Sequence, residues 1–245
     1  MKKGSLESLK RVVCEANLRL VAEGLVVRTW GNASGVDRAR GLMVIKPSGL
    51  AYSLMRPGDM AVVDLETGAP VGRTLKPSSD APTHLVLYRA FSGIGGIVHT
   101  HSSCATAWAQ AARSLPPLGT THADYFAGSV PCTRSMRGEE IAADYEVNTG
   151  RVIVECFSGL DPMEIPAVLV ANHAPFTWGA SVADAVENAC VLEQVARMAL
   201  ETLAIAPSTP AMAEALLAKH YGRKHGPGAY YGQAGKKQPG AGRRR

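Results

Sequence analysis

Three histidines most constrain how this chain can fold: His99 and His101 at the end of one apolar run, and His173 far along the sequence. Residues 96–98 lead into the first two, and the apolar run 167–170 leads into the third. Residues two apart in a strand point to the same side, so His99 and His101 can direct two imidazoles at one point. A third imidazole from another strand completes a set with open positions, as in catalytic metal sites. The alternative is that each is a hydrogen-bonded core residue.

The length and composition predict a globular protein. The chain has 245 residues, 46% of them hydrophobic, which suffices for one large domain or two small ones. Because no linker-like break precedes residue 222, we expect one domain over residues 1–233. No apolar run approaches the roughly 20 residues of a membrane span, and the first residues show no apolar leader. We therefore expect a cytoplasmic protein that does not bind a membrane.

The net charge of +5 comes from the end of the chain, where the segment 234–245 is rich in glycine and basic residues. That composition is typical of a disordered tail. Weak attraction to phosphate backbones is one interpretation of the tail, but a solvated appendage without nucleic-acid function is the simpler one. The five cysteines include no C-x-x-C pair, so neither a disulfide framework nor a zinc knuckle is indicated.

Periodicity and turn signals predict interleaved helices and strands without a regular βαβ rhythm, which favours a mixed or antiparallel sheet flanked by helices. The expected helices are 6–23, 83–91, 105–112, 182–203 and 212–221. The expected strands are 25–30, 42–46, 60–65, 96–101, 151–156 and 167–173.

Three polar loops have the composition of phosphate sites: Gly31-Asn32, Ser48-Gly49 and Ser78-Ser79. Backbone N–H groups and hydroxyls in such turns suit a phosphate, and Lys46 can supply a cation. Ordinary turns are the alternative for each loop taken alone.

Asp80 precedes an expected helix, so it is either an N-cap or a carboxylate near the metal, as a ligand or a base. The stretch from His122 to Tyr125, with Asp124 inside it, has the groups for proton transfer, although surface solvation is the commoner explanation. The segment 219–231 gathers histidine, arginine and tyrosine near the chain end, which is typical of a segment docked against another subunit.

Six motifs, in this order, resemble those of the L-ribulose-5-phosphate 4-epimerase family, within the class II aldolase and adducin-head superfamily. The resemblance runs from about residue 6 to Gln233. The motifs are Thr29–Ser34, Val44–Gly49, Lys76–Asp80, Gly95–Ser102, Gly119–Phe126 and the segment from Lys224 to Gln233.

The resemblance implies a single-domain α/β/α sandwich with a largely antiparallel central sheet, assembled as a homotetramer with active sites between subunits. It implies a zinc ion held by His99, His101 and His173, with Asp80 also at the metal. An imidazole-rich site also accepts manganese or cobalt.

The resemblance also implies the residues that bind substrate. An acid/base pair maps onto Asp124 and Tyr231, the latter from the neighbouring subunit, and His220 matches a further active-site histidine. Phosphate recognition maps onto Gly31, Asn32, Ser48, Gly49, Ser78 and Ser79.

The implied reaction interconverts L-ribulose 5-phosphate and D-xylulose 5-phosphate by retro-aldol cleavage and rejoining of the C3–C4 bond. Whether it serves arabinose or ascorbate breakdown stays open. One alternative is a class II aldolase for fuculose or rhamnulose phosphate; the fuculose enzyme has a glutamate where this chain has Asp80. A second alternative is a non-catalytic binding module like the adducin head, which lacks the metal ligands.

Overall fold

The structure is a computed structural model that describes residues 5–225 and 228–231. The expected basic tail, 234–245, and the expected domain end at residue 233 lie outside the described residues.

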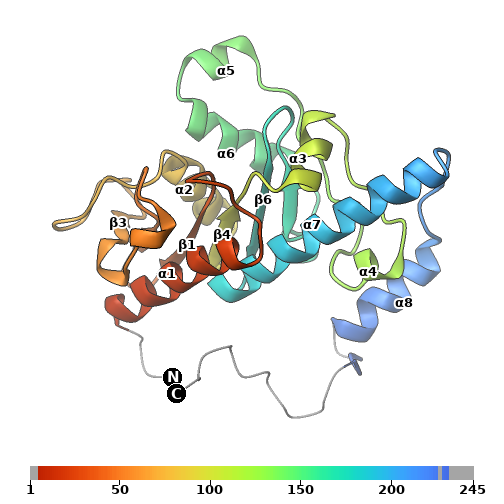
Figure 1. Ribbon diagram of the computed structural model, residues 1–245, viewed down its shortest axis with the longest axis horizontal. Coiled ribbons are helices and arrows are strands. Elements are labelled where there is room, and N and C mark those ends of the chain that lie inside the picture. Colours follow the sequence, from red (N-terminus) through yellow and green to blue (C-terminus); the bar gives the residue numbers. More distant parts are fainter. Residues whose placement is uncertain (1–4, 226–227, 232–245) are drawn as a thin grey trace.

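One antiparallel sheet organises the described chain, with the strand order β3-β2-β1-β4-β6-β5 (Figure 1). Every neighbouring pair in it is antiparallel. The strands are β1 (Asn32–Asp37), β2 (Leu42–Ile45), β3 (Ala61–Asp64), β4 (Gly96–His99), β5 (Ala167–Leu169) and β6 (Pro175–Gly179).

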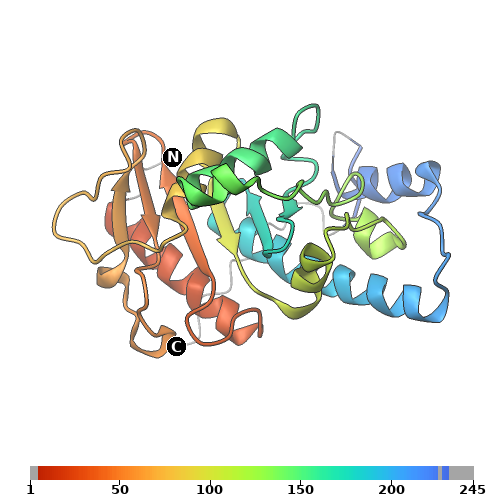
Figure 2. The same ribbon diagram turned by 90° about the horizontal axis from the view of Figure 1, so that it is seen from above.

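Helices cover both faces of this sheet. Figure 2 shows α2 (Ala81–Ala90) and α6 (Tyr145–Cys156) on one face, with α1 (Leu6–Ala22) and α7 (Val182–Ile205) on the other. The expected α/β/α sandwich with a largely antiparallel sheet is therefore confirmed. The remaining helical segments are α3 (Ser103–Gln110), α4 (Thr120–Ala123), α5 (Gly138–Ala142), α8 (Glu214–Lys224) and two 3₁₀ turns (Tyr52–Leu54 and Pro57–Asp59).

Side chains that point alternately to the two faces of the sheet divide the hydrophobic core into one cluster on each face. Met43 and Ile97 are fully buried in the cluster under α2 and α6, whereas Val44 and Val98 are buried in the cluster under α1 and α7. Neighbouring strand residues point to opposite faces, so a short apolar run can serve both clusters. Each such side chain contributes about 1.5–3 kcal/mol when it is fully buried.

The strand predicted over residues 25–30 is wrong. These residues form turns, and the strand is β1, which begins at Asn32 in what looked like a loop. The sequence of β1, Asn-Ala-Ser-Gly-Val-Asp, is rich in residues that strands disfavour. Its place between β2 and β4 supplies hydrogen-bond partners on both edges, and this tertiary pairing overrides the local preference.

The strand predicted over residues 151–156 is also wrong, because this segment is the second half of α6. Val152 and Ile153 are buried, and Ile153 belongs to the cluster shared with α2. A short apolar run does not distinguish a buried strand from a buried helix, and packing against α2 decides for the helix. The strand expected over 167–173 ends at Leu169, and the rest forms a turn.

Among the residues that the structure describes, no helix combines the length and apolar character needed to cross a bilayer.

Gly96 tests the contact between β4 and α7. A Cβ at residue 96 would meet the Cα of Val182 and lie 2.7 Å from its nitrogen. Because backbone atoms at a helix start cannot move aside, we expect Gly96→Ala to destabilise the protein by about 3 kcal/mol, the upper end for overpacking. Urea-induced unfolding measures this change.

Gly138→Ala is the matched control, because a Cβ there meets nothing within 4 Å. We expect its stability to stay within about 0.5 kcal/mol of the parent protein. Equal stabilities for the two variants would contradict the close contact at Gly96.

Candidate functional site

The register of three adjacent strands gathers the candidate residues at one edge of the sheet. Asn32, at the start of β1, pairs with His99, at the end of β4, and His99 pairs with Phe176 of β6. In antiparallel neighbours the start of one strand lies beside the end of the next. The start of β1, the end of β4 and the turn between β5 and β6 therefore meet.

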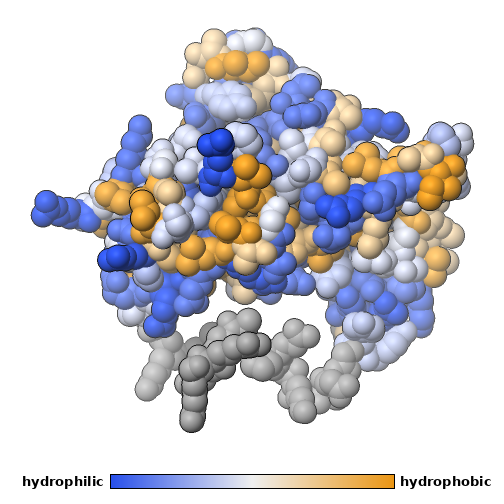
Figure 3. Space-filling model, in the orientation of Figure 1, coloured by the Kyte–Doolittle hydropathy of each residue, from blue (hydrophilic) through white to orange (hydrophobic). Residues whose placement is uncertain are grey.

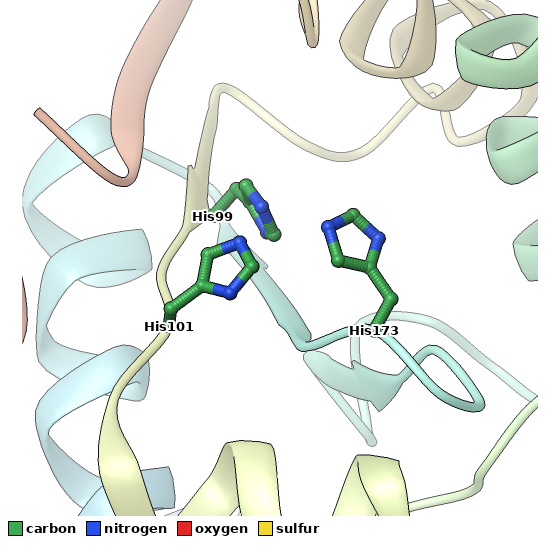
Figure 4. Close-up of side chains that lie close together, drawn as sticks. All are labelled: His99, His101 and His173. Carbon is green, nitrogen blue, oxygen red and sulfur yellow. The ribbon is translucent and has the colours of Figure 1, made fainter.

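The three histidines converge at this edge. One nitrogen from each of His99, His101 and His173 lies within 4.8 Å of the other two. Figure 4 shows the first two rings arriving from the end of β4 and the third from the β5–β6 turn. His173 occupies that turn directly after Asn172, whose φ of 60° is a left-handed conformation that asparagine tolerates. The predicted convergence is present in the fold.

The ring of His99 is held in one orientation. Its Nδ1 lies 3.0 Å from the carbonyl oxygen of Pro175, and its ring stacks on Phe176 with centroids 4.2 Å apart. When Nδ1–H donates to that carbonyl, Nε2 keeps its lone pair. This arrangement is typical of metal-ligating histidines, whose second nitrogen is hydrogen-bonded to a neighbouring group.

The histidines are neutral at pH 7, as metal ligands must be. Burial lowers the pKa of His99, although the charge of Asp80 opposes this. Burial and repulsion from His99 and His101 lower the pKa of His173 to about 4. The Nδ1 atom of His173 is buried and has no hydrogen-bond partner among residues 5–225 and 228–231. Three neutral imidazoles, one with an unsatisfied buried nitrogen, fit a divalent ion of the zinc type.

Asp80 supplies a carboxylate to the same place. It occupies the N-cap position of α2, but its side chain makes no capping hydrogen bond, and its Oδ2 instead accepts from Nδ2 of Asn32 at 2.6 Å. Burial raises the pKa of Asp80, but the hydrogen bond from Asn32, and attraction to His99 and His84 at any pH where these rings are protonated, outweigh it, so the net pKa is lowered. The carboxylate is therefore ionised and lines the same hollow as the histidines, and the interpretation of its side chain as a helix cap is wrong.

The histidines and the three polar loops share one hollow of about 370 Å³. The metal-ligand candidates and the phosphate-site candidates therefore come together in one chain. The lining residues are Thr29, Trp30, Gly31, Asn32, Lys46, Ser48, Gly49, Ser78, Ser79, Asp80, His99, His101 and His173.

Two of the polar loops are joined by a short bridge. The Ser48 amide donates to the carbonyl of Lys76, and the Ser78 amide donates to the carbonyl of Lys46, at 2.9 and 3.0 Å. The third loop packs closely on β4: Gly31 has a φ of 102°, and a Cβ there would lie 2.8 Å from the carbonyl oxygen of His99. Only glycine suits that position without strain.

Lys46 brings a buried cation to the hollow. Its side chain is only 2% exposed, with Nζ 3.3 Å from the carbonyl oxygen of Pro47 and 4.9 Å from the ring centre of Tyr52. Burial lowers its pKa, although the charge of Asp80 opposes this. An ammonium group withdrawn from water gains from an anionic ligand, so the position suits a phosphate.

The other predicted catalytic residues do not line this hollow. Asp124, His220 and Tyr231 gather where α4 meets α8. Nδ1 of His220 lies 3.0 Å from Oδ1 of Asp124, and Arg223 contacts both Asp124 and the Tyr231 ring. In one chain the predicted site is therefore divided into two groups of residues.

Sequence reasoning missed two residues at the rim, Thr29 and Trp30, which line the hollow. Trp30 is 55% exposed, an unusual state for so large a ring. Both belong to a motif that the sequence analysis singled out. Their orientation depends on a turn in which Arg28 has a φ of 55°, and such a turn is not readable from the residue types.

A buried histidine behind the site was also missed. Nδ1 of His84 lies 2.7 Å from Oγ of Ser34, which in turn lies 2.9 Å from the hydroxyl of Tyr88. Burial lowers the pKa of His84 to about 3. Its place within the apolar pattern of α2 carried no signal of a polar network.

A larger hollow, of about 540 Å³, lies at the opposite end of β1 and β4, and the described residues that line it include neither histidine nor lysine. Arg38, at its wall, donates to the carbonyls of Tyr88, Phe91 and Ile94, which uses its guanidinium within the fold. Size alone therefore does not identify the reactive pocket.

Comparisons with known proteins agree with the resemblance drawn from the six motifs. The sequence-family model of the class II aldolase and adducin N-terminal domain matches residues 11–200 of this chain. The L-ribulose-5-phosphate 4-epimerase UlaF of Salmonella paratyphi B is 52% identical over 228 residues, which cover 93% of this chain and all of that protein. The UlaF protein of Salmonella typhi matches with the same identity and coverage.

Solved structures share the fold at lower identity. An L-fuculose 1-phosphate aldolase superposes with a TM-score of 0.75 at 24% identity, covering 89% of this chain and 98% of that one. The L-fuculose-1-phosphate aldolase of Thermus thermophilus superposes with a TM-score of 0.64 at 23% identity, covering 83% of this chain and 98% of that one.

The histidine cluster predicts a stoichiometric metal ion. We expect the purified protein to carry about one zinc-type ion per chain, and His99→Asn to lose it, because two imidazoles hold such an ion poorly. Elemental analysis by mass spectrometry measures the content, and circular dichroism checks that the fold persists.

His122→Asn is the matched control. His122 is also buried, but its Nε2 lies 2.7 Å from the carbonyl oxygen of Gly128, outside the cluster. We expect this variant to keep its ion. A His99→Asn protein with full metal content would overturn the assignment of the cluster.

Proposed function

Because the chain belongs to the class II aldolase and adducin N-terminal domain family, we propose that it is a metal-dependent L-ribulose-5-phosphate 4-epimerase. It would interconvert L-ribulose 5-phosphate and D-xylulose 5-phosphate by breaking and remaking the C3–C4 bond. One observation carries the proposal: three neutral imidazoles and three phosphate-suited loops line one hollow. A ketose phosphate has the two groups that such a hollow recognises.

The comparison of identities favours the epimerase over an aldolase. Proteins named as epimerases are 52% identical over their whole length, whereas the fuculose phosphate aldolases are 24% identical or less and support only the fold. The short side chain of Asp80, held by Asn32, agrees with a role at the metal. A binding module without catalysis is disfavoured, because all three histidines are present.

The proposed ion is zinc, held by His99, His101 and His173 with Asp80 beside them. When bound, it acts as a Lewis acid that stabilises negative charge on substrate oxygens. The residues of the chain do the rest of the positioning. Lys46 and the serine loops hold the phosphate, so the two-carbon aldehyde fragment stays in place after the C3–C4 bond breaks.

Two groups that exchange protons are needed, one for each face of the inverted carbon. We assign these roles to Asp124 and Tyr231, with His220 beside Asp124. In either direction, one of them would remove the proton from the C4 hydroxyl before the C3–C4 bond breaks, and the other would donate a proton to the C4 oxygen after the opposite face is attacked. Since neither lines the hollow of its own chain, they would act in the site of a neighbouring subunit, in a homotetramer.

The surface near these residues supports an assembly. Ile205, at the end of α7, is 87% exposed, and Met198, Leu200 and Leu216 are each at least 40% exposed. Figure 3 shows this apolar surface at the end of α7. Contiguous apolar patches of this kind mark protein–protein contacts, so this region is a natural place for a subunit interface.

A direct assay tests the reaction. We expect L-ribulose 5-phosphate to be converted to D-xylulose 5-phosphate, and a chelator to abolish the conversion until zinc, manganese or cobalt is restored. Product analysis decides between the alternatives. Accumulation of free aldehyde and dihydroxyacetone would indicate an aldolase, and a metal-loaded protein inert toward both substrate classes would favour the binding module.

Mixing two inactive variants tests the shared site. Tyr231→Phe should lower kcat by about 100-fold or more by removing an acid/base group, and His99→Asn should abolish activity. When both are co-expressed, about a quarter of the sites in random tetramers combine an intact Tyr231 with intact histidines, so activity should return.

Co-expression of His99→Asn with His101→Asn is the control, because both changes damage the same half of the site and no activity should return. Failure of the first pair to regain activity would mean that the site lies within one chain.

A further inference from the structure

Arg223, in the last turn of α8, forms a bidentate ion pair with the carboxylate of Asp124. Its Nε lies 3.0 Å from Oδ1 of that carboxylate, and its Nη2 lies 2.6 Å from Oδ2. Such a paired contact fixes distance and orientation together, because the guanidinium and the carboxylate are both planar. Both groups are largely withdrawn from water, with side chains 24% and 12% exposed.

The same residue also holds the segment that contains Tyr231. The carbonyl oxygen of Arg223 accepts the amides of Tyr230 and Tyr231 at 2.9 and 3.0 Å. Its guanidinium carbon lies 4.7 Å from the centre of the Tyr231 ring, within the range of a cation–π contact. Tyr231 is 61% exposed, so few other contacts from the part of the chain that the structure describes restrain its ring.

The neighbouring side chains of His220 and Lys224 restrain Asp124 and Tyr231 less than Arg223 does. His220 contacts one oxygen of Asp124, and Nζ of Lys224 lies 3.7 Å from the other, beyond a good hydrogen bond. The Lys224 ammonium is also 4.9 Å from the Tyr231 ring centre, but it is a point charge without a fixed plane. Arg223 alone of these residues joins Asp124 and Tyr231 through oriented contacts.

We propose that Arg223 is a positioning residue that holds Asp124 and Tyr231 as one rigid unit for presentation to the substrate. The inference rests on the proposed function, in which these two residues handle protons at C4. It adds that neither residue is placed independently: the guanidinium plane sets the angle between the carboxylate and the phenol ring.

This arrangement has a chemical consequence for Asp124. Burial raises the pKa of the carboxyl, but the hydrogen bonds from Arg223 and His220 and the charge of Lys224 outweigh it, so the net pKa is lowered. The carboxylate is therefore ionised and aligned before substrate arrives. Preorganisation of this kind contributes to kcat more than to substrate binding.

The test uses Arg223→Gln and Arg223→Lys in the full, metal-loaded protein. We expect Arg223→Gln to lower kcat by about 100-fold while KM changes by less than about threefold, because a small misplacement of reacting groups costs that much. Arg223→Lys keeps the positive charge but loses the planar guanidinium that contacts both oxygens of Asp124. Its kcat should therefore lie between the values of the parent protein and Arg223→Gln. Added guanidinium ion should restore part of the activity of Arg223→Gln.

Lys219→Gln is the matched control. It removes the same charge from the same helix, where Nζ of Lys219 lies 5.3 Å from the Tyr230 ring centre. Its kcat should stay within about twofold of the parent value, as expected for a surface charge that contacts neither Asp124 nor Tyr231.

A second measurement does not depend on activity. Hydrogen–deuterium exchange of the peptide containing Tyr230 and Tyr231 should be about tenfold faster in Arg223→Gln than in the parent or in Lys219→Gln. Circular dichroism should show that all variants are folded. This readout stays valid if the protein proves inactive toward L-ribulose 5-phosphate, so failure of the proposed function is recognised separately.

Two outcomes would overturn the inference. Unchanged exchange in folded Arg223→Gln would mean that the guanidinium does not organise the segment. In an active enzyme, an unchanged kcat, or a loss confined to KM, would mean that Arg223 binds substrate or only supports the fold.

Discussion

The antiparallel register of β1, β4 and β6 is the constraint on which the rest of the site depends. It pairs Asn32 with His99 and His99 with Phe176. The start of β1, the end of β4 and the start of β6 therefore lie together at one edge of the sheet. A shift of one residue would turn His99 to the other face of the sheet. The close packing of Gly96 on the start of α7 opposes such a shift, because β4 cannot slide past the helix backbone.

Charge and burial then give the site its chemical character. Burial keeps His99 and His173 neutral, with lone pairs available to a cation, while the hydrogen bond from Asn32 helps to keep Asp80 ionised. Lys46 places positive charge in the lining of the same hollow. A ligand with a chelating end and an anionic end matches this polarity, and a ketose phosphate has both.

Much of the hollow could be predicted from the sequence, and the division of the site could not. Apolar runs before His99 and His173, and glycine and serine beside Lys46, are local signals that survive in the fold. The segments 25–30 and 151–156 were predicted as strands because local propensity does not record the partners of a segment. Trp30 and His84 escaped notice for the same reason: a turn orients one, and a buried hydroxyl network surrounds the other.

The sequence by itself determined which groups are available: three imidazoles after apolar runs, polar loops beside a lysine, and an acid and a tyrosine in motifs near α4 and the chain end. These follow from residue type and spacing. Only the tertiary structure decided which of them meet. It brought Asp80 to the histidines through Asn32 and joined Asp124 to Tyr231 through Arg223, away from the histidines. The reason is physical: contacts between distant residues depend on strand register and helix packing, which a local pattern does not contain.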